Sequence, residues 1–424
     1  MKEKIKILAI SDHPLSPSGV GIQTKYMIEG LLKTGNFKVI SLGGAIKHNN
    51  YNPVKVTGYE DDWTIFPVDA YGNEEIIRSI LRTERPDILW FMTDPRFYEW
   101  LWGIENEIRP LVPMVYYHVW DNYPHPFFNK KYYDSNDAIV AISKVTHDII
   151  KTVSPEIDAY YLPHAVDSEI FKKIDSEKVD NVRKTFLKEE DEENEKFICF
   201  WNNRNARRKQ SGTLMFWFKE FLDKIGHDNA CLIMHTDPSD ENGQDLNAII
   251  ESLSLVKGQI LISNQKLAAK EMALMYNMVD CTINISDAEG FGLATLESLS
   301  CETPIIVNMT GGLQEQVTDG ELWFGIGIEP ASKAIIGSQN VPYIYEDRLN
   351  KEDFLAALEK MYNLWKTDKN AYEEIGKLGK EYTSRKYNFE DYQKKWQETL
   401  LNIHEKYGSW ENRKHYNPWE LIEV

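Results

Sequence analysis

Short apolar segments alternate with amphipathic ones along the first half of the chain, which predicts strands interleaved with helices. We expect strands here at Ile5–Ser11, Phe37–Leu42, Asp87–Met92, Met114–Val119 and Ala138–Ser143. The segment after Gly21 carries apolar residues at helical spacing through Leu32, so a helix should follow the first strand. Strands that alternate with helices favour a mainly parallel sheet covered on both faces.

The second half repeats this pattern, with predicted strands at Phe197–Trp201, Cys231–His235, Gln259–Ile262, Cys281–Ser286 and Pro304–Asn308. A helix is expected at Leu293–Ser300. From Asn350 onward the sequence is helical, and Tyr387–Tyr407 should form a long final helix. The tail beyond Ser409 holds Trp410 and Trp419, and we expect these large apolar side chains to pack against a surface.

Between the two halves, Lys172–Lys196 is dense in charge and ends in the acidic run of residues 188–195. Such a run favours a solvated linker or surface loop at a domain boundary. We therefore predict an α/β protein of two Rossmann-like domains, 1–185 and 190–389, with 390–424 returning to the first domain. Functional sites in such folds lie beyond the carboxyl ends of the strands, here in a cleft between the domains.

Composition narrows the classes of partner. The 424 residues are 42% hydrophobic and 27% charged, as in ordinary globular proteins, and the net charge is -18. This charge disfavours nucleic acid and an anionic membrane as partners, although a local basic patch leaves peripheral membrane contact open. The four cysteines contain no CxxC pair, which favours small buried side chains in a reducing, cytoplasmic compartment. The charged start of the chain does not resemble a signal peptide, and we expect no transmembrane segment.

The most informative segment runs from Asp287 to Glu297 and follows the predicted strand at Cys281–Ser286. It reads as a tight turn, Gly290-Phe291-Gly292, leading into a helix, and a second glycine pair lies at Gly311-Gly312. Free amides and the positive end of a helix dipole bind phosphate. Glu289 and Glu297, on either side of that turn, can accept hydrogen bonds from hydroxyl-rich groups flanking a phosphate. The segment therefore predicts a nucleotide-sugar site.

A first glycine loop, Ser16–Thr24, follows the first strand and contains Gly19 and Gly21. It resembles the GxGxxG pattern of dinucleotide-binding proteins, but Thr24 stands where the third glycine belongs. The next strand also lacks the acidic residue that would hold a ribose. A nicotinamide or flavin site is therefore disfavoured. A loop that approaches a phosphate or an acceptor is favoured, and a simple tight turn remains the alternative.

Four cations crowd the segment Trp201–Lys209, just after another predicted strand. We expect Arg204 and Lys209 to bind a diphosphate and to neutralise the charge that grows as a sugar–phosphate bond breaks. The alternative is a solvent-facing basic turn that balances nearby acidic side chains.

His118 ends a predicted strand and leads into an aromatic loop with Trp120, Asp121 and Tyr123. With Asp94 nearby, these residues are candidates for acceptor binding, while core packing or a partner interface remains the alternative. The acidic segments Asp61-Asp62 and Asp237–Glu241 have no partners at ligand spacing, so we expect exposed loops and no bound metal there.

Together these features resemble family 4 of the retaining glycosyltransferases, which has the two-domain GT-B fold. The likeness covers nearly the whole chain. Its landmarks are the Gly19–Gly21 loop, His118, Ser143-Lys144, Leu162–Asp167 before Phe171, Arg204 with Lys209, Glu289–Glu297 and Gly311-Gly312. The chain departs from the family at His164-Ala165 and at Trp201–Asn203, where the family has Asn-Gly and a glycine-rich turn.

The resemblance implies a role for each site residue. Glu289 would hold the hydroxyls of the donor sugar, Glu297 the ribose, and Arg204 and Lys209 the diphosphate, while His118 faces the sugar. Glycines and backbone amides would complete donor binding, at Gly19, Gly21, Gly290, Phe291, Gly292, Leu293 and Ala294. The donor base would be held by backbone groups around residues 262–268. Domain 1–185 would bind the acceptor and domain 190–389 the nucleotide sugar.

We therefore expect a cytoplasmic hexosyltransferase that moves a sugar from a nucleotide-diphosphate sugar to an acceptor hydroxyl. The resemblance implies retention of configuration, front-face attack and no metal or other cofactor. A glycan, a lipid-linked sugar and a small molecule all remain open as acceptor. The alternatives are a non-catalytic relative that binds nucleotide sugars or glycans and, from the first glycine loop, a nucleotide-dependent oxidoreductase.

Overall fold

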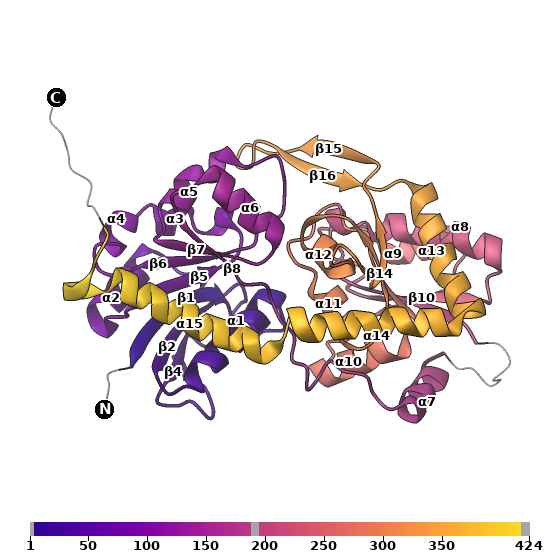
Figure 1. Ribbon diagram of the computed structural model, residues 1–424, viewed down its shortest axis with the longest axis horizontal. Helices are drawn as coiled ribbons and strands as arrows, with labels where there is room; N and C mark the ends of the chain where they lie inside the picture. Colours follow the sequence, from indigo (N-terminus) through magenta and orange to yellow (C-terminus); the bar gives the residue numbers. More distant parts are fainter. Residues whose placement is uncertain (1–3, 188–194, 417–424) are drawn as a thin grey trace. The chain divides into compact units, whose positions relative to one another are not determined.

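The computed structural model describes residues 4–187 and 195–416, which form two compact units, each around its own sheet (Figure 1). Unit 1 contains residues 4–164, 337–344 and 390–416. Unit 2 contains residues 165–187, 195–336 and 345–389. The chain therefore returns to unit 1 twice, once for a short segment and once for its last helix.

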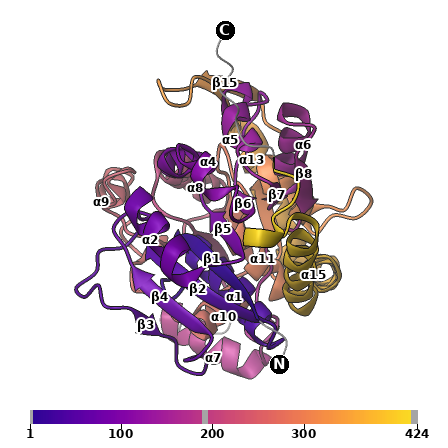
Figure 2. The ribbon, with the colours of Figure 1, turned by 90° about the vertical axis from the view of Figure 1, so that its left-hand side faces the viewer.

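The sheet of unit 1 has the strand order β3-β4-β2-β1-β5-β6-β7-β8, which can be followed in Figure 2. Only the edge pair β3–β4 is antiparallel among these described strands. Because the other pairs are parallel, their carboxyl ends meet at one edge of the sheet. The strands are β1 (Ile5–Asp12), β2 (Phe37–Gly44), β3 (Val54–Lys55), β4 (Trp63–Pro67), β5 (Ile88–Met92), β6 (Met114–His118), β7 (Ala138–Ala141) and β8 (Asp158–Tyr161).

Helices follow these strands, and polar side chains cap several of them. Ser18 caps α1, Asn73 caps α2 and Ser143 caps α6, each accepting a hydrogen bond from an amide in the first turn. The helices of unit 1 are α1 (Gly19–Leu32), α2 (Glu74–Glu84), α3 (Glu99–Trp102), α4 (Glu105–Ile108), α5 (Lys130–Asp134), α6 (Lys144–Val153) and α15 (Phe389–Tyr407), with short 3-10 turns η1 (Pro95–Phe97), η2 (Phe127–Asn129) and η5 (Trp410–Asn412).

The last helix, α15, packs closely on α1 and on the sheet of unit 1. Gly30 of α1 makes this approach possible, because a Cβ there would lie 2.8 Å from Cβ of Gln393. Trp396 is fully buried, and its ring lies 5.8 Å from that of Trp90 and 4.8 Å from that of Tyr117. This aromatic contact fixes α15 to the centre of the sheet.

The sheet of unit 2 is parallel throughout, with the order β11-β10-β9-β12-β13-β14. Its central strands are almost completely buried, as expected for a parallel sheet covered on both faces. The strands are β9 (Phe197–Asn202), β10 (Ala230–His235), β11 (Ile260–Ser263), β12 (Cys281–Asn284), β13 (Ile305–Asn308) and β14 (Gly325–Ile328).

Helices also follow the strands of unit 2, and a separate two-stranded ribbon, β15 (Ser332–Ile336) and β16 (Ile344–Arg348), comes after β14. The residues between these two strands belong to unit 1. The helices are α7 (Ser176–Leu187), α8 (Ser211–Ile225), α9 (Leu246–Ser252), α10 (Ala269–Met278), α11 (Leu293–Ser300), α12 (Gln314–Val317), α13 (Lys351–Thr367) and α14 (Lys369–Lys386), with 3-10 turns η3 (Arg207–Lys209) and η4 (Gly311–Leu313).

The predicted strands are confirmed in both units, each with ends within two residues of those observed. The predicted helices at Leu293–Ser300 and beyond Asn350 are confirmed too. Strands β3, β4, β8, β14, β15 and β16 were not predicted from the sequence. β3 has only two residues, β4 ends in Pro67, β8 is only half-buried, β14 alternates glycine with isoleucine, and β15 and β16 are largely exposed or half-buried.

The predicted domain boundary needs correction. The units divide between His164 and Ala165, not within the charged segment. That segment contains α7, and Arg183 on this helix donates to both carboxylate oxygens of Asp280 at 3.0 Å, which ties it to unit 2. Most of the predicted acidic linker, residues 188–194, lies outside the described residues, as does Trp419. Trp410 packs as expected, with its Nε1 donating to the carbonyl oxygen of Pro86 at 2.9 Å.

The four cysteines are buried and free, in agreement with the sequence analysis. In the described ranges, 4–187 and 195–416, no helix combines the length and apolar character that a membrane crossing requires.

Candidate functional site

The turn between β12 and α11 is held in shape by close packing against a second glycine segment. Gly292 has φ +91°, and a Cβ there would lie 2.6 Å from Cδ2 of Leu313 and 2.7 Å from Oγ1 of Thr295. Gly312 donates its amide to the carbonyl oxygen of Glu289 at 3.0 Å, and its own Cβ would lie 2.6 Å from Cα of Phe291. Only glycine fits both places, so both predicted glycine motifs build one turn.

Helix α11 begins directly at this turn without a side-chain cap. Its first amides therefore point outward with the positive end of the helix dipole, as in phosphate sites. Gln316 stabilises the turn, because its Nε2 donates to the carbonyl oxygen of Phe291 at 2.7 Å. Leu293 and Ala294, in the first turn of α11, are partly exposed. This geometry suits an anion held by backbone groups.

Lys209 forms an ion pair with Glu289, which lies in this turn. Lys209 is 7% exposed, and Nδ2 of Asn284 donates to Oε2 of Glu289 at 3.2 Å. Burial alone raises the pKa of Glu289, but the charges of Lys209 and Arg208 outweigh this effect and lower that pKa overall. The pair is therefore charged at neutral pH, and the two predicted site residues lie together.

The basic segment after β9 is joined to the turn by further contacts. Nη1 of Arg208 donates to the carbonyl oxygen of Ala288 at 2.5 Å, and the amide of Asp287 donates to the carbonyl oxygen of Arg208 at 2.8 Å. Gln210 donates from Nε2 to Asp287 at 2.6 Å. Burial raises the pKa of Asp287 to about 6. These contacts join the basic segment to the carboxylate turn.

Arg204 points elsewhere in this structure. Its Nε lies 2.6 Å from Oδ2 of Asp240, and its side chain is 65% exposed. Arg207 similarly pairs with Glu346. The alternative of a basic turn that balances nearby acids therefore describes both arginines here. Asp240 lies in the acidic segment predicted to be an exposed loop, where Asp237 and Glu241 are exposed, and its own side chain is 13% exposed and paired with Arg204.

Glu297, the second predicted carboxylate, lies on α11 and is partly exposed. Its Oε2 accepts a hydrogen bond from Oη of Tyr276 at 2.7 Å. Burial raises the pKa of Glu297 to about 7, although the tyrosine hydroxyl acts in the opposite direction. The carboxylate is thus poised between its neutral and ionised forms at neutral pH.

In unit 1, Asp12 at the end of β1 stabilises the first glycine loop by accepting hydrogen bonds. Oδ2 of Asp12 accepts from Oγ of Ser18 at 2.6 Å, and Oδ1 accepts from Oη of Tyr71 at 2.8 Å. Ser18 in turn accepts from the amide of Gly21 at 3.0 Å. A Cβ on Gly21 would lie 2.7 Å from the carbonyl oxygen of His13, so this glycine permits a tight loop. Gly19 begins α1 in the same loop.

His118 is fully buried at the carboxyl end of β6. Its Nε2 lies 2.7 Å from Oη of Tyr133, and within the described residues its Nδ1 has no hydrogen-bond partner. Burial lowers the pKa of His118 to about 3, so the imidazole is neutral at physiological pH. Its role toward a sugar stays a prediction.

The predicted acceptor residues are anchored to their own loops. Asp94 caps η1 and pairs with Arg96, with its Oδ1 2.8 Å from the arginine Nε. Nε1 of Trp120 donates to the carbonyl oxygen of Asn122 at 2.9 Å. Oη of Tyr123 donates to Asp148 at 2.8 Å. These residues and Asp121 follow β5 and β6, at the carboxyl edge of the sheet, and their role in acceptor binding stays a prediction.

Sequence reasoning missed two hydrogen-bond partners of the predicted carboxylates, Asn284 and Tyr276, and the hydrogen bond from Arg208 to the backbone carbonyl of Ala288. Asn284 ends the apolar strand β12, and a polar residue at the carboxyl end of a buried strand could have indicated a site residue. Tyr276 lies in α10, where it looks like an ordinary core residue.

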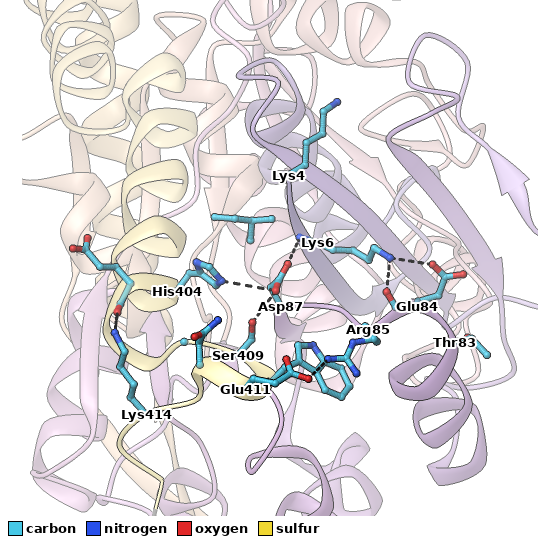
Figure 3. Close-up of a pocket in the computed structure, with 15 residues that line it drawn as sticks. Lys4, Lys6, Thr83, Glu84, Arg85, Asp87, His404, Ser409, Glu411 and Lys414 are labelled. Atoms are coloured by element: carbon cyan, nitrogen blue, oxygen red, sulfur yellow. Dashed lines mark hydrogen bonds and ion pairs between the residues drawn. The ribbon is translucent and has the colours of Figure 1, made fainter. Parts of the chain in front are cut away.

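Unit 1 also has a cavity of about 730 Å³ at the amino ends of β1 and β5 (Figure 3). Its charged side chains pair with one another: Lys6 with Glu84 at 3.3 Å, and Arg85 with Glu411 at 2.8 Å. Because sites in such sheets lie at the opposite, carboxyl ends, we do not assign the reaction to this cavity. Among the residues that the structure describes, no three His, Cys, Asp or Glu side chains gather into a metal site.

Comparison with known proteins agrees with this geometry. Residues 182–377 match the family described as "Glycosyl transferases group 1". A stretch of 251 residues is 23% identical to N-acetyl-alpha-D-glucosaminyl L-malate synthase of Bacillus anthracis, covering 57% of this chain and 60% of that protein. A stretch of 110 residues is 27% identical to D-inositol 3-phosphate glycosyltransferase of Paenarthrobacter aurescens (strain TC1), covering 26% of each chain. The matches thus span less than two thirds of either relative.

Solved structures share the fold at low sequence identity. Sucrose-phosphate synthase from Thermosynechococcus elongatus superposes with a TM-score of 0.74, 14% identity and coverage of 95% of this chain and 100% of that one. The structure of Anabaena Alr3699/HepE in complex with UDP-glucose superposes with a TM-score of 0.66 and 15% identity, and the match covers 94% of this chain and 100% of that one. Residues 182–377, somewhat less than half of the chain, therefore match a glycosyl transferases group 1 domain, and the GT-B fold predicted from the sequence is confirmed.

Proposed function

We propose that this protein is a retaining glycosyltransferase that moves a sugar from a nucleotide-diphosphate sugar to an acceptor hydroxyl without a metal ion. The main support is the site in unit 2, where the charged pair Lys209–Glu289 lies beside the uncapped start of α11. A cation and helix amides suit a diphosphate, while carboxylates suit neutral hydroxyl groups. The group 1 domain match covers both carboxylates.

The reaction breaks the bond between the anomeric carbon and the phosphate oxygen and forms a bond to the acceptor oxygen on the same face of the sugar. The acceptor proton passes to the departing phosphate. Negative charge grows on the diphosphate as it leaves, and Lys209 with the first amides of α11 stabilises that charge. Because these groups are held in place before the reaction, they need little rearrangement in the transition state.

The two carboxylates would act on different parts of the donor. Glu289 binds the hydroxyls of the transferred sugar, and its contact with Lys209 brings that sugar close to the diphosphate. Glu297 binds the ribose. The HepE complex with UDP-glucose, a protein of the same fold, is consistent with a nucleotide-sugar donor for this chain.

We place the acceptor at the carboxyl edge of the sheet of unit 1, where Trp120 and Tyr123 follow β6. A glycan, a lipid-linked sugar and a small molecule all fit this proposal. The free, buried cysteines favour a cytoplasmic location.

Thermal unfolding with UDP, GDP, ADP, their common sugars and NAD, each with and without EDTA, tests the proposal. A ligand at about 100 times its dissociation constant should add roughly 2.7 kcal/mol of stability. We expect one nucleoside diphosphate to raise the Tm in the presence of EDTA. A shift with NAD alone would overturn the proposal, and NMR of the product reports whether the configuration is retained.

A further inference from the structure

The carboxylate of Glu297 is held by a short relay of hydrogen bonds that begins at the end of β9. Nδ2 of Asn202 donates to Oη of Tyr276 at 2.8 Å, and this hydroxyl donates to Oε2 of Glu297 at 2.7 Å. The three residues come from β9, α10 and α11, all within unit 2. The relay thus connects the first strand of unit 2 to the helix that carries the carboxylate.

The tyrosine in the middle of the relay has little freedom to move. Tyr276 is fully buried, and its ring lies 5.3 Å from that of Phe200 and 6.2 Å from that of Phe171. Oγ1 of Thr303 also donates to the backbone carbonyl of Tyr276 at 2.6 Å. With ring and backbone held, the hydroxyl oxygen stays within hydrogen-bond distance of Glu297.

Within residues 4–187 and 195–416, no other side chain donates a hydrogen bond to Glu297. Tyr276 engages Oε2, which leaves Oε1 available for a ligand. Burial and the charge of Glu297 raise the pKa of the Cys301 thiol, which directly follows α11. A single buried donor therefore sets the direction of the carboxylate.

We propose that Tyr276 and Asn202 are positioning residues that orient the Glu297 carboxylate to accept hydrogen bonds from the ribose hydroxyls of the donor nucleotide. This inference rests on the proposed function. The side-chain amide of Asn202 supplies the donor that holds the tyrosine hydroxyl.

The relay predicts a preference for ribose that depends on pH. Burial raises the pKa of Glu297 to about 7, and the Tyr276 hydroxyl limits that rise. The ionised carboxylate, present above about pH 7, can accept from two ribose hydroxyls. Loss of the tyrosine hydroxyl should therefore weaken ribose binding and move its pH dependence to higher pH.

The test measures, by calorimetry at pH 6 and 8, the binding of UDP, GDP and ADP and of their 2′,3′-dideoxy forms. The wild-type protein should bind one ribonucleotide at least about 10-fold more tightly than its dideoxy form, and more tightly at pH 8. In Tyr276→Phe, which keeps the ring, affinity for the ribonucleotide should fall roughly 10-fold while that for the dideoxy form is unchanged. Asn202→Gly should lose part of the preference.

Tyr372→Phe is the matched control, because its hydroxyl also makes a hydrogen bond in unit 2, to the carbonyl oxygen of Asp280 at 2.7 Å. It should keep the full ribose preference. If Tyr276→Phe and Asn202→Gly both keep the wild-type preference and pH dependence, the inference is wrong although the proposed function stands. If the wild-type protein binds none of the nucleotides, the proposed function itself fails. Should Tyr276→Phe not fold, Asn202→Gly alone decides.

Discussion

Lys209, buried at the end of η3, forms an ion pair with Glu289 in the turn that follows β12. The side chains are 9% and 13% exposed, so neither charge is well hydrated. Removing one partner leaves the other charge in a poorly hydrated place, which destabilises a protein more strongly than loss of a surface ion pair. The residues proposed for catalysis are therefore also structural in this chain.

Lys209→Met and Glu289→Gln should each lower transfer by roughly 100- to 1000-fold, because each removes a preorganised charge from the transition state. Each should also lower the free energy of unfolding by about 3–5 kcal/mol. Turnover with a saturating donor and urea unfolding measure the two effects. Lys219→Met, which breaks an exposed pair with Asp223, should change neither. Near-normal turnover in either folded site variant would overturn the assignment.

Gly292→Ala should weaken donor binding, whereas Gly320→Ala should not. Both glycines have positive φ, +91° and +103°, so a side chain at either place strains the backbone by about 1–2 kcal/mol. Only at Gly292 does the new Cβ also meet neighbours below 3 Å, and the turn must then move. Thermal shifts with the donor nucleotide separate the two effects. Equal shifts in the two variants would show that the turn does not bind the donor.

The sequence predicted the fold well because most strands of both sheets are buried on both faces and appear as continuous apolar runs. It failed where burial is weaker or the composition ambiguous, as in β8 and β14. It also misplaced the boundary, since the charged Lys172–Lys196 looks like a linker. Arg183, part of that charge, is in fact paired with Asp280.

The site was predictable only in part. Glu289, Glu297 and the glycines follow a strand directly, so their place at the edge of the sheet follows from the order of elements alone. Contacts between residues far apart in the sequence cannot be predicted from the order of elements. Tyr276 lies 21 positions before Glu297, and Arg204 lies 36 before Asp240. Nothing in the local pattern shows which of several nearby acids each basic side chain will meet.

Arg204→Ala tests whether this arginine binds the donor or only balances Asp240. If Arg204 reaches the diphosphate during the reaction, its loss should raise the KM for the donor about 10-fold or more, as for a hydrogen bond to a charged group. Asp240→Asn should leave that KM unchanged or lower it, because it releases the arginine. Donor kinetics on both variants give the answer. An equal effect of the two substitutions would favour the balancing role.

His118 should titrate outside the working pH range. Burial lowers its pKa to about 3, so the imidazole stays neutral above about pH 4. The pH profile of kcat from 5 to 9 should then contain no step that disappears in His118→Ala. This variant should be milder than Lys209→Met if His118 only positions the sugar. A lost ionisation near neutral pH would instead make His118 an acid or base in the reaction.

Glu297 should make the protein less stable as pH rises. Its pKa is about 7 in the folded protein and about 4.5 ordinarily, so between these values the folded state holds more protons than the unfolded state. The contribution of Glu297 to the free energy of unfolding is therefore greatest below about pH 4.5. It falls by roughly 3 kcal/mol as the pH rises to about 7. Glu297→Gln keeps an acceptor for Tyr276 but cannot ionise, so its stability relative to wild type should rise across this window and level off above it.

Urea unfolding at pH 5, 6, 7 and 8 measures the difference, with Glu398→Gln on the exposed face of α15 as control. Parallel curves for wild type and Glu297→Gln would show that this carboxylate is already well solvated. The donor would then meet an ionised Glu297 at every pH in this range, and binding would not need the tyrosine hydroxyl to keep the carboxylate charged.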